Sequence, residues 1–87
     1  MTFDQWVDAV NVQLRARLGG DVRTQELSWD SAYWVGKGGN AVAALEDDGT
    51  TARLTFDGGE HLALDLSKPE AEPAVVTDVI AQRLAAR

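Results

Sequence analysis

The chain has no cysteine among its 87 residues, a single histidine and no long apolar run. Without cysteine, disulfides, thiolate metal sites and thiol nucleophiles are excluded, and a reducing compartment is allowed. The longest wholly apolar stretch, residues 41–45, is far shorter than the about 20 residues that cross a membrane. Asp4 and Asp8 stand where a signal peptide needs positive charge. We therefore expect a cytoplasmic protein with no membrane association.

Positive charge is also scarce, because eight Lys and Arg face fourteen Asp and Glu, for a net charge of −6. Such a balance opposes binding to phosphate backbones, so we expect no direct contact with nucleic acid. The acidity is local. Residues 40–72 carry eight acids and two bases, whereas residues 1–39 sum to −1 and residues 73–87 to +1.

Length and periodicity predict one domain over residues 1–87 with a helix near each end. Thr2 and Gln5 have the spacing of a capping box, and apolar residues recur at helical intervals after them, which predicts a helix over about 2–18. Pro73 suits the first turn of a second helix, and the apolar stripe that follows it predicts a helix over about 73–86.

Between the helices, residues 33–66 contain short apolar or alternating runs separated by turns rich in glycine and aspartate. This pattern predicts an antiparallel β-meander of three to four strands. Both helical stripes are best buried on one face of that sheet, which gives a two-layer α+β domain. Residues 21–32 are weakly patterned and fit either a short strand or an extended connection.

Register follows from the requirement that apolar side chains share one face. A turn at Asp48 and Gly49 pairs Ala43 with Leu54. A three-residue turn over residues 58–60 pairs Leu54 with Leu64.

The same turn places Asp57 opposite His61, a pair that could act as a general base and its partner. An ordinary cross-strand pair at a sheet edge explains these two residues more simply. No Gly-x-Ser-x-Gly sequence accompanies the histidine, so serine nucleophile chemistry is not expected.

Two further patterns imitate ligand sites. Residues 46–49 are acidic but lack the alternating ligands and distant glutamate of a calcium loop. The Gly-Lys-Gly-Gly sequence at residues 36–39 lacks the spacing of a phosphate-binding loop. Both fit tight turns, so we expect no metal and no cofactor.

Two groups of residues remain as candidate partner-binding sites. The first is apolar: a two-residue turn at Gly38 and Gly39 would place Trp34 inward opposite Ala43, with aromatic and aliphatic side chains on the sheet face that the helices leave uncovered. These apolar candidates are Tyr33, Val35 and Val42. Alternatively, residues 21–32 or a longer loop could fold over them. The second group is acidic and comprises Glu46, Asp47, Asp48, Asp57, Glu60 and Asp65.

These observations favour a small acidic, non-enzymatic protein-interaction domain whose partner has a basic surface. If that surface normally binds nucleic acid, the chain would inhibit the partner by occluding it, as anti-defence proteins of phages do. The alternative function is a homodimeric assembly subunit that packs through its open sheet face. A third possibility is an enzyme using His61 and Asp57. The acidic stretch also has a simpler explanation as a solvated edge that maintains solubility.

Overall fold

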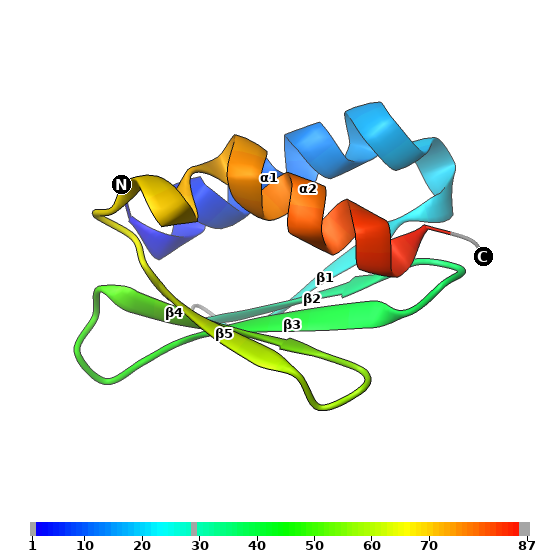
Figure 1. Ribbon diagram of the computed structural model, residues 1–87. Coiled ribbons are helices and arrows are strands. Elements are labelled where there is room, and N and C mark those ends of the chain that lie inside the picture. The colour runs from blue at the N-terminus through cyan, green and yellow to red at the C-terminus, as the bar shows by residue number, and fades with distance from the viewer. Residues whose placement is uncertain (1, 29, 86–87) are drawn as a thin grey trace.

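The computed structural model describes residues 2–28 and 30–85 as an α+β domain with two layers (Figure 1). Its elements are α1 (Phe3–Leu18), η1 (Gly19–Asp21), β1 (Arg23–Ser28), β2 (Ser31–Val35), β3 (Asn40–Leu45), β4 (Thr51–Phe56), β5 (His61–Asp65), η2 (Pro69–Ala71) and α2 (Pro73–Leu84). The five strands pair antiparallel in chain order, and both helices lie on one face of the sheet. The predicted fold class is confirmed, with five strands in place of three to four.

The additional strand is β1, which comes from the segment that sequence patterning left undecided. Its backbone pairs with β2 from Arg23 opposite Val35 to Ser28 opposite Ser31, with an irregularity after Glu26. Weak alternation is compatible with this position because β1 is an edge strand with only one neighbour.

The first helix begins as its sequence predicts. The Gln5 N–H donates to Thr2 Oγ1 at 3.2 Å, and the Thr2 N–H donates to Gln5 Oε1 at 3.1 Å, which completes the capping box. The helix ends at Gly19, whose φ of 62° is accessible to glycine at little steric cost.

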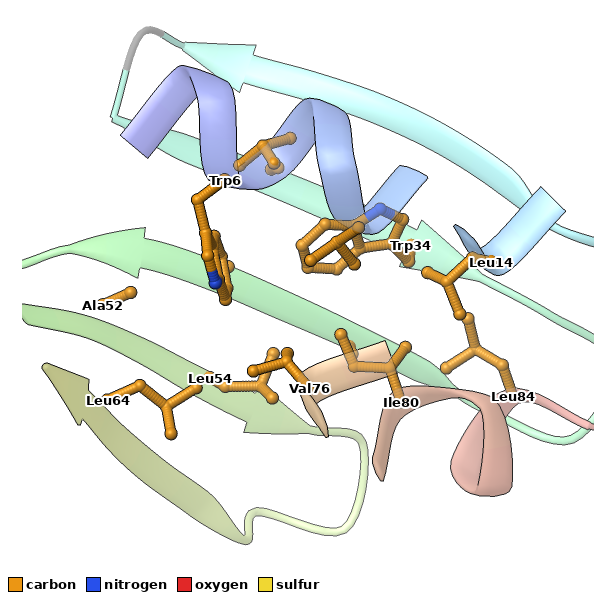
Figure 2. Packing of buried hydrophobic residues seen from close by; sticks show 14 of the residues in the cluster. Trp6, Leu14, Trp34, Ala52, Leu54, Leu64, Val76, Ile80 and Leu84 are labelled. Carbon is orange, nitrogen blue, oxygen red and sulfur yellow. The ribbon is translucent and has the colours of Figure 1, made fainter. Parts of the chain in front are cut away.

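The core is built from two indoles over small side chains. Figure 2 shows Trp6 of α1 and Trp34 of β2 in the space between the layers. Their rings pack edge to face, with 6.4 Å between the ring centroids. Each indole N–H has an acceptor: Trp6 donates to the Ala71 carbonyl at 2.8 Å, and Trp34 donates to Asn11 Oδ1. Fully buried alanines occupy the inward positions of the central strands, and their small size makes room for the rings. They are Ala41, Ala43 and Ala52.

The strand registers agree with the sequence prediction in one hairpin and differ by two residues in two others. Between β3 and β4, Ala43 lies opposite Leu54 as expected. Between β2 and β3, Trp34 lies opposite Ala41, and the predicted pair with Ala43 is wrong. A register shift of two residues leaves every side chain on its predicted face of the sheet, because side chains along a strand alternate with a period of two residues.

The β4–β5 turn has the predicted length of three residues but begins one residue earlier. The Gly59 N–H donates to the Phe56 carbonyl at 2.9 Å, and the Phe56 N–H donates to the Glu60 carbonyl at 2.8 Å, with Gly59 at φ 87°. Leu54 therefore lies opposite Leu62, so the predicted pairing of Leu54 with Leu64 is wrong.

The glycine-rich turn after β2 caps the C-terminal end of α2. The Gly38 N–H donates to the Leu84 carbonyl at 3.0 Å, one of the carbonyls that a helix end leaves without an internal partner. A Cβ on Gly36 would lie 2.3 Å from the Leu84 oxygen, and one on Gly38 would lie 1.8 Å from the Ala85 oxygen. The glycines thus permit close approach of two backbones.

We expect Gly38→Ala to lower the free energy of unfolding by about 2 kcal/mol, because the added methyl group forces the turn away from the helix end. Gly20→Ala is the matched control, since a Cβ there meets nothing within 4 Å; its effect should stay within about 0.5 kcal/mol. Urea denaturation followed by circular dichroism measures both. Equal destabilisation by the two variants would contradict the capping role.

Candidate interaction surface

The sheet face opposite the helices, here called the open face, carries the predicted apolar candidates. No described helix lies on this side of the sheet (Figure 1). Tyr33 and Val42 lie directly opposite each other on β2 and β3, and Val35 lies opposite Asn40. All three apolar candidates are half-buried, because side chains on neighbouring strands partly cover one another. The open face thus has an apolar centre.

Polar side chains surround this centre. Arg23 and Gln25 are exposed on β1, and Arg53 is exposed on β4. Since β1 pairs with the edge of β2, it extends the sheet, and the alternative in which this segment folds over Tyr33 is wrong for the described residues. Trp29 lies outside the described residues. A polar border around an apolar centre is typical of a non-obligate protein interface.

The six acidic candidates fall into two groups at opposite ends of the sheet. One group, here called the acidic end, belongs to the β3–β4 turn and the neighbouring end of β5; it comprises Glu46, Asp47, Asp48 and Asp65. Asp57 and Glu60 belong to the β4–β5 turn at the other end of those strands. These two groups do not form one continuous surface.

Two carboxylates of the acidic end also hold their turns together. Asp48 Oδ1 accepts the N–H groups of Thr50 and Thr51 at 2.9 Å each, and Asp48 Oδ2 accepts the Thr51 hydroxyl at 2.7 Å. Asp65 Oδ1 accepts the Ser67 hydroxyl at 2.6 Å and the Ser67 N–H at 2.9 Å. Aspartate is favoured in turns for this kind of bond.

The same hydrogen bonds favour the ionised form of both carboxyl groups. The Thr51 hydroxyl, followed by the backbone N–H groups of Thr50 and Thr51, lowers the pKa of Asp48. Bonds from the Ser67 hydroxyl and N–H lower the pKa of Asp65, although the charge of Asp48 acts in the opposite direction. These two carboxylates therefore keep their negative charge to a lower pH than an unperturbed aspartate would.

Glu46 differs from its neighbours, because Arg53 Nε lies 2.8 Å from its Oε1. The pair is exposed, with 55% of the Arg53 side chain and 37% of the Glu46 side chain accessible, so it contributes little to stability. The positive charge of Arg53 does offset the negative charge of Glu46 beside the open face. Asp47 and Asp48 are both exposed at the tip of the turn.

At the other end of the sheet, Glu60 is bound by Arg83 of α2. The guanidinium donates to Glu60 Oε1 at 2.9 Å and also to Oε2, and it stacks 4.6 Å from the centroid of Phe56. The hydrogen bond and then the charge of Arg83 lower the pKa of Glu60. Glu60 and Arg83 are 23 positions apart, so no local pattern in the sequence could have paired them.

The predicted pairing of His61 with Asp57 is wrong. Because the β4–β5 turn begins earlier, His61 lies opposite Thr55, while Asp57 belongs to the turn. Both side chains are exposed. The described residues contain no group of three or more His, Asp or Glu arranged to hold a metal ion.

Neither described helix is both long and apolar enough to cross a membrane. No family model, curated protein or solved structure matches the chain. The side-chain contacts of the molecule are therefore the basis for proposing its function.

The bonds of Asp48 predict a pH-dependent effect of its removal. A carboxylate with a lowered folded-state pKa contributes stability that is fully present above its unfolded pKa and is lost as pH falls through the folded value. We expect Asp48→Asn to lower the urea midpoint at pH 7, and the difference from wild type to shrink below the unperturbed pKa of 3.8.

Asp47→Asn is the control, because it removes the same charge from the neighbouring position and no described residue bonds to Asp47. Its urea midpoint should stay close to that of wild type at both pH values. A loss of the same size in both variants, or one independent of pH, would show that the Asp48 bonds do not stabilise the turn.

Proposed function

We propose that this chain is a small, acidic, non-enzymatic protein-interaction domain whose open face binds a partner protein with a basic surface. The observation that carries the proposal is the apolar centre formed by Tyr33 and Val42 on a sheet face that no described helix covers. Contiguous apolar side chains with a polar border on a soluble protein often mark a binding site. The five-stranded sheet offers a rigid platform for such a site.

The acidic end supports a basic partner. Asp47 and Asp48 lie at the tip of the β3–β4 turn, Glu46 lies at the start of that turn, and Asp65 lies at the neighbouring end of β5. Bonds within the turns hold two of these carboxylates in place, so they are positioned before a partner arrives. Positioned charges of one sign accelerate encounter with a surface of the opposite sign and disfavour other partners.

A partner of this kind would be inhibited by occlusion. If its basic surface normally binds nucleic acid, the carboxylates would occupy positions that phosphates otherwise take, while the apolar centre adds burial that phosphates do not supply. No bond would be made or broken in this function.

The test uses variants that separate charge from apolar contact. Partners captured from the native host on wild-type resin are purified, and their dissociation constants are measured by calorimetry at low and high salt. We expect Tyr33→Thr combined with Val42→Thr to abolish measurable binding. The two threonines keep the strand propensity of these positions, whereas the apolar centre is lost.

Charge reversal supplies the second arm. Asp47→Lys should weaken binding about tenfold at low salt, and the loss should diminish at about 1 M salt. Asp8→Lys makes the same change in net charge on the exposed side of α1 and should leave affinity unchanged. Binding that is insensitive to salt, or that survives loss of Tyr33 and Val42, would overturn the proposal.

The second candidate function is an assembly subunit in which two copies pack open face against open face. It is favoured by the same uncovered Tyr33 and Val42. Under this alternative, the double threonine variant would be monomeric at concentrations where wild type is dimeric, and no separate partner would be required.

A further inference from the structure

Strand β5 is an edge strand whose outer side has no partner strand. The Phe56 N–H bonds to the Glu60 carbonyl, and the Leu66 N–H bonds to the Thr50 carbonyl at 2.9 Å. Backbone groups alternate in direction along an antiparallel strand, so the N–H and C=O groups of His61, Ala63 and Asp65 point away from β4. The strand has no proline, lysine or bulge of the kinds that commonly block edge pairing.

The sequence of β5 is complementary to itself. In the run His-Leu-Ala-Leu-Asp, an antiparallel pairing centred on Ala63 places His61 opposite the second copy's Asp65 at both ends. It also brings together the three residues whose backbone groups point outward. The imidazole of His61 can donate a hydrogen bond to a carboxylate whether it is neutral or charged.

The carboxylate of Asp65 has capacity for this bond. Its bonds to Ser67 use Oδ1 alone, so they leave Oδ2 for the imidazole. The Asp65 carbonyl already accepts the Lys68 N–H at 2.9 Å. The backbone pairing therefore depends chiefly on the two Ala63 residues and on the bond from the Asp65 N–H to the second copy's His61 carbonyl.

Exposed apolar side chains lie along the same edge. Leu62 is 43% exposed on the helix side of β5, and Val75 of α2 is 48% exposed. Val75 shares a side of α2 with Val79 and Arg83, and Arg83 reaches Phe56 and Glu60, so this side faces the β5 edge. In the antiparallel pairing, Leu62 would lie opposite the second copy's Leu64 and would be covered.

We propose that two copies of this chain form a symmetric dimer through antiparallel pairing of β5 with β5, centred on Ala63. The two sheets become one continuous sheet, and the helices of both copies lie on the same side of it, because the two-fold axis is perpendicular to the sheet. The open faces of both copies remain uncovered and adjacent. The dimer leaves Tyr33 and Val42 free for the proposed partner, although it shares Asp65 with the acidic end.

Sedimentation equilibrium of the full chain tests this dimer over about 1 μM to 1 mM, the range in which a modest interface is measurable. We expect wild type to dimerise and Ala63→Pro to be monomeric, since proline removes an N–H that points away from β4 and leaves the internal ladder intact. Ala63→Thr keeps the N–H and should dimerise like wild type. Thermal unfolding checks that each variant is folded.

A second pair of variants decides the question if the proline variant does not fold. His61 is exposed and bonds to no described side chain, so changes there should not disturb the monomer. His61→Asp sets two carboxylates against each other and should weaken the dimer at least about tenfold, whereas His61→Lys should preserve or strengthen it.

A wild-type chain that is monomeric at about 1 mM would overturn the proposal. So would a dimer whose dissociation constant is the same in the His61→Asp and His61→Lys variants. A dimer that persists in the folded Ala63→Pro variant and is lost with Tyr33→Thr and Val42→Thr would show that the copies pack through their open faces instead.

Discussion

The contact between the two indoles above a layer of alanines is the constraint on which the rest of the fold depends. Trp6 comes from the first helix and Trp34 from the second strand, and both rings are completely buried. A sheet presents a wide surface to a helix, and large side chains on both would hold the layers apart. Alanines at the inward positions of the central strands let the rings lie close to the backbone, so the layers interlock.

In this arrangement, the indole N–H of each ring donates a hydrogen bond to a segment outside the sheet. Trp6 reaches the carbonyl of Ala71 in η2, which ties the approach to the second helix to the first helix. Trp34 reaches Asn11 on α1. Each ring therefore links elements that no covalent cross-link joins, in a chain that has no cysteine. The open face can remain without a covering layer because the other face supplies most of the burial.

Sequence patterning predicted the features that short-range signals determine, and it failed where two strand registers satisfied the same pattern equally well. The helix starts and the β3–β4 register follow from a capping box and an aspartate–glycine turn, which are short-range signals. The requirement for a common apolar face fixes register only to within two residues. With glycines at both 58 and 59, the turn could begin at either of two positions, and the bond from Gly59 to Phe56 selects the earlier one.

The sequence predicted which side of the sheet the candidate residues occupy, but not which side chains from distant parts of the chain contact them. Alternation alone places Tyr33 and Val42 on the outer side of the sheet, and the sequence locates the acidic turns. Nothing near Glu60 in the chain indicates that its carboxylate is bound by Arg83, because that contact exists only after α2 packs beside the β4–β5 turn. Sequence patterning left residues 21–32 undecided between a short strand and an extended connection, since the identity of β1 depends on its pairing with β2.

The docking of the glycine-rich turn against the end of α2 has a consequence for the order in which the molecule can be completed. The turn is synthesised long before the helix whose last carbonyls it meets. A helix of 12 residues is marginal alone in water, so the contact with the β2–β3 turn stabilises the last turn of α2. The sheet and the end of the C-terminal helix therefore stabilise each other, and a nascent chain that lacks its last residues lacks the carbonyl that the Gly38 N–H meets.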